Sequence, residues 1–225
     1  MASNVQLEVF ARPTDPPIRG WLHSPKPARG DALVLTHGAG ANAQAPLLIA
    51  LAETFSAAGF AVLRCDLPFR QTRPFGPPGP GDATRDRAGL KHAVTAMKEI
   101  APGRIFLGGH SYGGRQASML CAEEPDLVAG LLLLSYPLHP PRKPEQQRTQ
   151  HLPDLRTPTL FIHGTRDPFG SIAELEKALK MIPARVKLMP VEGAGHDLGF
   201  KGKAKQEELL KLIISEFTKF FELSS

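Results

Sequence analysis

Short apolar runs alternate along the chain with longer stretches in which apolar residues recur every three or four positions. The short runs predict strands and the wider spacing predicts amphipathic helices. The predicted strands are Val5–Phe10, Ile18–Leu22, Ala32–Thr36, Phe60–Arg64, Arg104–Gly108, Val128–Ser135, Thr159–His163 and Val186–Val191. The predicted helices are Pro46–Ala58, Asp82–Ile100, Tyr112–Glu123, Ile172–Ile182 and Gln206–Leu223.

The order of these elements predicts an α/β fold. The first two strands are expected to form a hairpin. Later strands are continuously apolar, which is typical of a parallel sheet covered by helices on both faces. We expect one domain over residues 1–225, with a mostly parallel sheet of about eight strands. A chain of 225 residues can bury such a core without disulfides or a structural metal.

Composition narrows the class of protein. Hydrophobic residues make up 42% and charged residues 22%, which is typical of soluble globular proteins. No apolar stretch approaches the ~20 residues of a membrane span, and the N-terminus lacks a signal-peptide pattern. We therefore expect a cytoplasmic protein that does not bind a membrane. Cys65 and Cys121 match no metal-ligand spacing and are expected to be buried and unpaired.

The net charge of +5 could indicate a nucleic-acid partner. However, no arginine-rich block, zinc-finger spacing or RNA-binding motif accompanies the charge. We interpret it as a solvated basic surface and predict no nucleic-acid binding.

One motif carries a clear chemical signal. Gly109-His110-Ser111-Tyr112-Gly113 lies between a predicted strand and a predicted helix. In this G-x-S-x-G pattern the serine occupies a strained turn, and the glycines avoid collisions with neighbouring backbone. The N-terminus of the following helix favours negative charge beside the serine. The motif predicts that Ser111 is a nucleophile.

A serine hydroxyl needs an adjacent base, and the base needs an acid that orients it. Asp167 and His196 each follow a separate predicted strand. The carboxyl ends of parallel strands meet at one edge of the sheet, so we expect both side chains near Ser111. The order Ser, Asp, His is the one found with this motif. These three residues are the predicted catalytic set, and Asp197 is the competing acid.

An oxyanion intermediate requires hydrogen-bond donors, normally two backbone N–H groups. Tyr112, directly after the serine, is expected to provide one. The other is expected from the loop His37-Gly38-Ala39-Gly40-Ala41-Asn42, whose small residues allow close approach to a substrate carbonyl. Ala39 is the predicted donor.

These residues resemble the α/β-hydrolase superfamily over nearly the whole chain. Further segments are similar to the branch that contains testis-expressed protein 30 and bacterial dienelactone-hydrolase-like relatives. They are His37-Gly38-Ala39-Gly40, Cys65-Asp66-Leu67-Pro68-Phe69-Arg70, Gly113-Gly114-Arg115, Tyr136-Pro137-Leu138-His139-Pro140-Pro141 and Gly164-Thr165-Arg166-Asp167-Pro168-Phe169-Gly170. The resemblance implies the α/β-hydrolase fold and its serine triad. Members often carry Arg-Ser-Met where this chain has His110-Ser111-Tyr112.

Each candidate also has a simpler interpretation. Ser111 could be a turn residue, Asp167 a helix cap before Pro168, and His196 a solvated loop histidine. Four further histidines are expected in supporting or packing positions: His37, His110, His139 and His163. None of them forms a known metal-binding spacing, so we predict no metal and no cofactor.

The stretch Gly38-Ala39-Gly40-Ala41-Asn42-Ala43 also imitates a G-x-G-x-x-A dinucleotide fingerprint, with Asp66 ending the next strand. In that fingerprint the glycines open the helix. Here Pro46 suits the first helical turn, which leaves the glycines several residues too early. Nicotinamide-dinucleotide binding is therefore the least favoured alternative.

Loops at the same edge of the sheet suggest how substrate enters. The proline-rich stretch 139–157 is too short for a helical lid, so we expect an open site with residues 66–82 as the opposite wall. Arginines expected near Ser111 are Arg70, Arg73, Arg115, Arg142 and Arg166. They predict either a cationic mouth that steers anionic esters or structural pairing with Asp66, Asp82 and Asp86. The predicted substrate contacts are Arg70, Arg115, His139 and Arg166.

The sequence therefore predicts a serine hydrolase that cleaves small carboxylic esters or thioesters, with a small-molecule ester as its partner. The alternative from another class is an interaction domain that keeps the fold without turnover, because a fold does not by itself imply a function. A domain related to this branch occurs in a regulatory subunit of a chromatin acetyltransferase complex. The complete catalytic set favours the enzyme.

Overall fold

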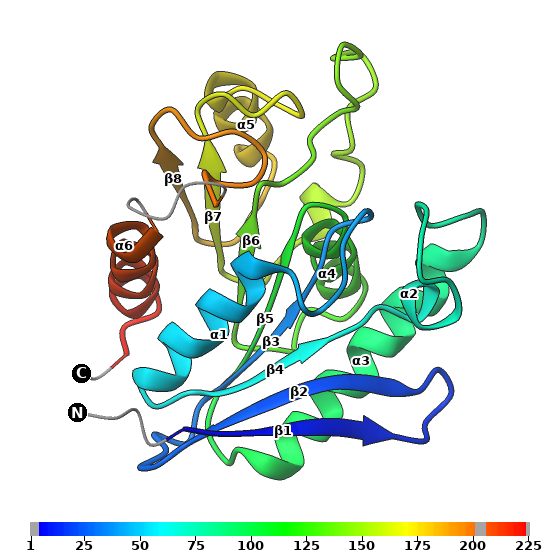
Figure 1. Cartoon of the computed structure of the whole chain (residues 1–225). Coiled ribbons are helices and arrows are strands. Elements are labelled where there is room, and N and C mark those ends of the chain that lie inside the picture. Colours follow the sequence, from blue (N-terminus) through cyan, green and yellow to red (C-terminus); the bar gives the residue numbers. More distant parts are fainter. Residues whose placement is uncertain (1–4, 201–205, 224–225) are drawn as a thin grey trace.

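The computed structural model describes residues 5–200 and 206–223. Its framework is a sheet with the strand order β1-β2-β4-β3-β5-β6-β7-β8 (Figure 1). The strands are β1 (Val5–Arg12), β2 (Ile18–Pro25), β3 (Ala32–Thr36), β4 (Ala61–Cys65), β5 (Ile105–His110), β6 (Gly130–Leu134), β7 (Thr159–Gly164) and β8 (Val186–Val191). β1 pairs with β2 and β2 with β4 in antiparallel fashion, and the remaining pairs are parallel. The predicted hairpin and mostly parallel sheet are confirmed.

Helices connect the parallel strands. They are α1 (Pro46–Ala57), α2 (Pro68–Thr72), α3 (Asp82–Ile100), α4 (Tyr112–Glu123), α5 (Ile172–Leu179) and α6 (Gln206–Phe220), together with a 3₁₀ turn at Leu152–Asp154. α2 and the 3₁₀ turn were not expected from the sequence pattern. Both are shorter than two helical turns, so neither has room for a repeating apolar face.

Three predicted helix ends lie too far along the chain: α1 ends at Ala57, one residue before the predicted Ala58, and the other two differ by three residues. α5 ends at Leu179 and not at Ile182, and α6 ends at Phe220 and not at Leu223. In both cases the apolar residues beyond the end are buried, with Ile182 6% and Leu223 7% exposed. The apolar pattern therefore continues past the helix because the following turn also packs on the core.

The continuous apolar runs are explained by cores on both faces of the sheet. In β3, Ala32 and Val34 pack in the core that contains residues of α3, α4 and α5. The intervening Leu33 and Leu35 pack in the core that contains residues of α1 and α6. Successive side chains of a strand point to opposite faces, so a strand between two cores must be apolar at every position.

The connection between β6 and β7 decides how open the site is. From Ser135 to Pro158 the chain forms turns, bends and the single 3₁₀ turn, with no helical lid. The prediction of a lidless domain is confirmed. In the described part of the chain, every helix is too short or too polar to cross a membrane. Cys65 and Cys121 are both buried and unpaired, as expected.

Candidate active site

Ser111 lies at a sharp turn between β5 and α4. Its backbone has φ 51° and ψ −119°, a strained conformation for a residue with a side chain. A Cβ atom on Gly109 would come within 2.5 Å of the Gly114 nitrogen, and one on Gly113 within 2.4 Å of the His37 oxygen. The motif glycines are thus required by close backbone contacts, for the reason that the sequence indicates.

His196 joins Ser111 to Asp167. Its Nε2 lies 2.8 Å from Ser111 Oγ, and its Nδ1 lies 2.8 Å from Asp167 Oδ2. A carboxylate only accepts hydrogen bonds, so Nδ1 carries the proton and Nε2 is left to accept the hydrogen of the Ser111 hydroxyl. The three side chains therefore form one directed chain of hydrogen bonds, with the histidine in the form that can act as a base.

Asp167 is held by its own loop. Its side chain is fully buried, and its Oδ1 accepts a hydrogen bond from the Phe169 backbone N–H at 2.9 Å. The helix-cap interpretation is wrong, because α5 begins later and its cap is Ser171. Asp197 is not the partner of His196 Nδ1, so the structure decides between the two candidate acids in favour of Asp167.

Three neighbours hold this arrangement: His110 and His163, which were predicted in supporting or packing positions, and Phe169, whose role the sequence did not indicate. The Phe169 ring stacks on the His196 ring, with centroids 4.2 Å apart. His110 Nε2 lies 2.7 Å from the His196 carbonyl oxygen, which ties the serine turn to the histidine loop. His163 Nε2 lies 2.8 Å from the Gly170 carbonyl oxygen, which ties β7 to the end of the Asp167 loop.

The protonation state of His110 follows from its surroundings. A carbonyl only accepts hydrogen bonds, so Nε2 carries the proton and Nδ1 has a free lone pair. Burial lowers the pKa of His110 to about 4. His110 is therefore neutral near pH 7 and adds no positive charge beside His196.

The loop after β3 lies against Ser111, and His37 orients its first peptide groups. The Leu67 N–H donates to His37 Nε2 at 3.0 Å, so the proton of His37 is on Nδ1, which donates to the Gly38 oxygen at 2.8 Å. In a trans peptide the N–H points opposite to the C=O, so the Ala39 N–H is directed away from His37. A Cβ on Gly38 would lie 3.3 Å from Ser111 Cβ, so this loop packs against the serine turn.

The other predicted donor is the backbone N–H of Tyr112. Tyr112 is the first residue of α4, and a helix has no internal acceptor for its first N–H groups. Its hydroxyl donates to Asp86 Oδ2 at 2.7 Å, so the side chain is directed toward α3 and away from Ser111. The side chain of Tyr112 is thus engaged with α3, and the role of its backbone N–H as an oxyanion donor stays a prediction.

Arg70 supports the same loop from behind. It is 5% exposed and donates to the carbonyl oxygens of Ala39, Ala41, Arg73 and Gly76 at 2.6 to 3.1 Å. These bonds use four of the five guanidinium N–H groups. Arg70 thus connects the loop after β3 to the segment after α2. Contact between Arg70 and substrate stays a prediction, and this network weighs against it.

The other predicted substrate contacts differ in their surroundings. Arg166 is exposed, and Arg115 is half-buried with its Nε unpartnered. His139 Nδ1 lies 2.8 Å from the Pro140 oxygen, and its Nε2 lies 3.6 Å from Glu174. Arg73 pairs with Asp82 on the surface, which agrees with the structural alternative for that arginine. Arg142 is exposed in the loop after β6.

The residues of the dinucleotide fingerprint have other roles. Asp66 Oδ1 accepts a hydrogen bond from the Ala43 N–H at 2.8 Å, and Asp66 Oδ2 lies 3.4 Å from Arg19. The glycines precede α1, which begins at Pro46. No group of three His, Cys, Asp or Glu side chains within residues 5–200 and 206–223 is arranged to hold a metal ion.

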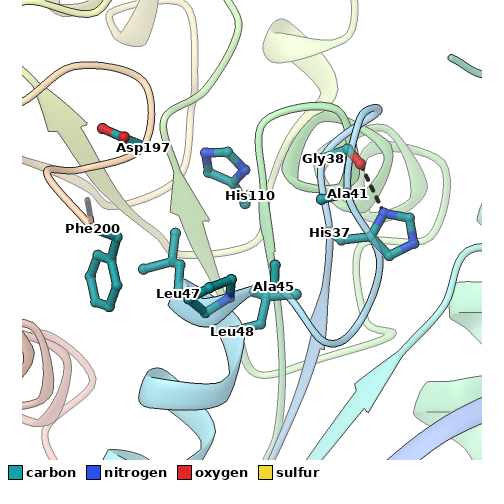
Figure 2. A pocket seen from close by; sticks show the side chains of 10 residues that line it. His37, Gly38, Ala41, Ala45, Leu47, Leu48, His110, Asp197 and Phe200 are labelled. Atoms are coloured by element: carbon teal, nitrogen blue, oxygen red, sulfur yellow. Dashed lines mark hydrogen bonds between the residues drawn. The ribbon is translucent and has the colours of Figure 1, made fainter. Parts of the chain in front are cut away.

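A cavity of about 280 Å³ lies beside the turn that carries Ser111 (Figure 2). Its described lining consists of His37, Gly38, Ala41, Ala45, Pro46, Leu47, Leu48, His110, Asp197 and Phe200. Ser111 is not part of the lining, but Gly38 and His110 both contact it and join the cavity to the serine. Figure 2 shows His110 between the loop after β3 and the segment that carries Asp197.

Comparison with known families agrees with this architecture. Residues 29–222 match the model of the alpha/beta hydrolase domain. The chain belongs to this family. The strand order and the serine turn after β5 are the features expected from the resemblance. The narrower likeness to the branch of testis-expressed protein 30 stays a prediction.

Solved structures with the same fold include several ester hydrolases by name. A dienelactone hydrolase from Anabaena variabilis is 22% identical with a TM-score of 0.74, covering 96% of this chain and 98% of that one. Est1E from Butyrivibrio proteoclasticus is 16% identical, with a TM-score of 0.73 and coverage of 95% and 99%. A bacterial heroin esterase is 20% identical, with a TM-score of 0.75 and coverage of 99% and 86%. At these identities the likeness shows the fold.

A curated relative matches a short segment. The polyketide synthase ThaQ from Burkholderia thailandensis is 46% identical over 48 residues, which are 21% of this chain and 2% of the synthase. The chain thus spans a small part of that protein. The match therefore does not extend the synthase's activity to this chain.

Proposed function

We propose that the protein is a serine hydrolase that cleaves small carboxylic esters or thioesters through an acyl-enzyme intermediate. The observation that carries this proposal is the chain of two 2.8 Å hydrogen bonds from Ser111 through His196 to Asp167. The strained backbone of Ser111 supports it, because such strain is kept where the surrounding structure and the function require it. Membership of the alpha/beta hydrolase family agrees with a hydrolase.

The geometry supports a two-step reaction. His196 Nε2 takes the proton of Ser111 as Oγ attacks the substrate carbonyl, and Asp167 stabilises the resulting imidazolium. The backbone N–H groups of Ala39 and Tyr112 hold the oxyanion. Collapse breaks the ester bond, and His196 returns the proton to the leaving alcohol or thiol. A water molecule then repeats the sequence on the acyl-enzyme and releases the acid, with His196 again acting as base.

Labelling and turnover test this proposal. The wild-type protein is treated with a fluorophosphonate probe and assayed with p-nitrophenyl acetate and butyrate. We expect labelling and hydrolysis, and we expect Ser111→Ala to lose both. Ser24→Ala is the matched control, because Ser24 lies in β2, which β4 and β3 separate from β5 and the serine turn.

The same assay separates the enzyme from the interaction domain. If the folded wild-type protein is neither labelled nor active on these esters or on their thioester counterparts, the serine-hydrolase proposal fails. Labelling that persists in Ser111→Ala would also contradict it, because the reactive residue would then lie elsewhere.

A further inference from the structure

The cavity beside Ser111 has a definite chemical character. Most of its described lining is apolar and comes from the loop after β3, the start of α1 and Phe200. Engineered apolar cavities of about 150 Å³ hold benzene. A cavity of about 280 Å³ therefore has room for one substituted aromatic ring or a compact aliphatic group, and it is too small for a long acyl chain.

The polar side chains in the lining are not equally available. Both ring nitrogens of His37 are used, because Nε2 accepts from Leu67 N–H and Nδ1 donates to Gly38. His110 uses Nε2 for the His196 carbonyl. Its Nδ1 has no hydrogen-bond partner within the described residues and lies beside Gly38, where a Cβ would approach it to 3.1 Å. His110 Nδ1 is therefore a hydrogen-bond acceptor at the wall between the cavity and the nucleophile.

His110 Nδ1 remains an acceptor under assay conditions. The pKa of His110 is lowered to about 4 by burial, so the ring is neutral near pH 7. A neutral acceptor cannot pair with a carboxylate or a phosphate, but it can receive the hydrogen of a hydroxyl or an amide. Asp197, which also lines the cavity, is an acceptor as well when ionised.

We propose that this cavity binds either the acyl group or the alcohol group of the ester. The bound group is compact, uncharged and aromatic or aliphatic, and it carries a hydrogen-bond donor that His110 Nδ1 selects. This inference rests on the proposed esterase function and names its substrate class. It differs from the anionic substrate considered for the loop arginines, since the described lining contains no arginine or lysine.

The first experiment measures substrate preference. Values of kcat/KM are compared for p-nitrophenyl 3-phenylpropionate and its 3- and 4-hydroxyphenyl and 4-carboxyphenyl forms. The acetates of 2-phenylethanol and of its hydroxylated and carboxylated forms test the alcohol side. In one of the two series we expect a hydroxylated ester to be preferred over the unsubstituted one by about fivefold, the factor that one net hydrogen bond contributes. The carboxylated ester should be the poorest substrate.

Two variants of His110 distinguish selection of the substrate by Nδ1 from the structural hydrogen bond that Nε2 makes to the His196 carbonyl. In His110→Gln the side-chain amide can reach the position of Nε2, and in His110→Asn the side-chain amide can reach the position of Nδ1. We expect His110→Gln to lose the preference for the hydroxylated ester, and His110→Asn to keep it while kcat falls for every ester. The readout is the ratio of kcat/KM for the hydroxylated ester to kcat/KM for the unsubstituted ester, because a uniform loss of activity cancels in this ratio.

Filling the cavity provides an independent test. Ala45→Phe should lower kcat/KM for the aryl esters about tenfold relative to vinyl acetate, which has no group to occupy the cavity. Ala57→Phe is the matched control, since Ala57 is an exposed residue at the other end of α1. The absence of any hydroxyl preference in both series, or an unchanged ratio in Ala45→Phe, would overturn the proposal.

Failure of the proposed function is recognised separately. If no ester is hydrolysed, binding of 2-phenylethanol and of its 4-hydroxyphenyl form is measured by isothermal titration calorimetry. Tighter binding of the hydroxylated alcohol that Ala45→Phe abolishes would support the cavity assignment without catalysis. Binding that Ala45→Phe does not change would refute it.

Discussion

At the scale of single residues, the site depends on which nitrogen of each histidine carries the proton. His196, His110 and His37 are each next to a group that can only accept or only donate, and that neighbour determines the tautomer. In His196 the result is a basic Nε2 toward Ser111. In His37 it is a donor toward Gly38, which orients the loop after β3.

Asp167→Asn tests this arrangement. The asparagine amide can donate to His196 Nδ1 and so favour the tautomer that no longer accepts the Ser111 proton. We expect kcat to fall by about 10⁴-fold, the loss typical of this substitution in serine triads, with the fold unchanged by circular dichroism. Asp126→Asn, an exposed carboxylate after α4, should leave kcat unchanged. Comparable kcat for Asp167→Asn and wild type would mean that another acid orients His196.

Gly113→Ala tests the close contact behind the nucleophile. Alanine is the better helix former, by about 1 kcal/mol. Its Cβ would nevertheless lie 2.4 Å from the His37 oxygen and 2.6 Å from Thr36 Cγ2. We expect the clash to dominate and the free energy of unfolding in urea to fall by about 1–3 kcal/mol.

Gly40→Ala is the control for this substitution, because a Cβ at Gly40 would meet no atom within 4 Å. Its free energy of unfolding should match that of the wild type. A Gly113→Ala protein as stable as the wild type would show that α4 can move away from the loop after β3 at little cost.

At the scale of elements, the serine turn, the loop after β3 and the segment after α2 act as one assembly. α2 is five residues long and begins with Pro68, whose ring suits the first helical turn. Its buried Arg70 reaches two segments that are distant in sequence from each other. This short helix thus places the Arg70 guanidinium between the two segments.

Arg70→Lys tests this role. Lysine keeps the charge but cannot reproduce the planar fork of donors, so carbonyl oxygens of the loop after β3 would lose their partners. Each buried carbonyl left without a partner costs about 1–3 kcal/mol. We expect a lower melting temperature and a fall in kcat, measured with p-nitrophenyl acetate. Arg73→Lys should change neither, since Arg73 is about half exposed and its pair with Asp82 is at the surface.

Most elements could be predicted because each has a pattern longer than one turn. The strands were found from apolar runs, although several of their ends differ from the structure, as at β2, which ends at Pro25 and not at Leu22. α3 and α4 were found from their spacing, with bounds that the structure reproduces. α2 could not be found this way. Its prolines indicated a loop, and its helical conformation depends on burial of Phe69 and Arg70 against distant segments.

At the scale of the whole molecule, several buried histidines make stability depend on pH. Burial lowers the pKa values of His23, His110 and His151 to about 4. In the unfolded chain these groups have ordinary pKa values near 6.5. Between pH 6.5 and 4 the unfolded state therefore binds more protons than the folded state. The contribution of these histidines to the free energy of unfolding is fully present above pH 6.5 and is lost as the pH falls toward 4.

Urea unfolding between pH 7.5 and 4.5 measures this effect. Each such histidine contributes at most about 1.4 kcal/mol per pH unit in that window. His23 accepts a hydrogen bond from Arg64 Nε at 2.9 Å, and a glutamine oxygen can take its place. We expect His23→Gln to reduce the slope of the unfolding free energy against pH. Equal slopes in wild type and His23→Gln would contradict the assignment.

The amino-acid sequence by itself determined the layers of the fold, the serine turn and the chain order of the candidate residues. The spacing of buried positions and the strain at the serine turn are local properties. They can therefore be predicted from local patterns, namely the apolar runs and the motif from Gly109 to Gly113. The choice of Asp167 over Asp197, the partners of Arg70, the free Nδ1 of His110 and the cavity beside it were decided by the tertiary structure. Each depends on contacts between segments that are distant along the chain and meet only when the sheet is assembled.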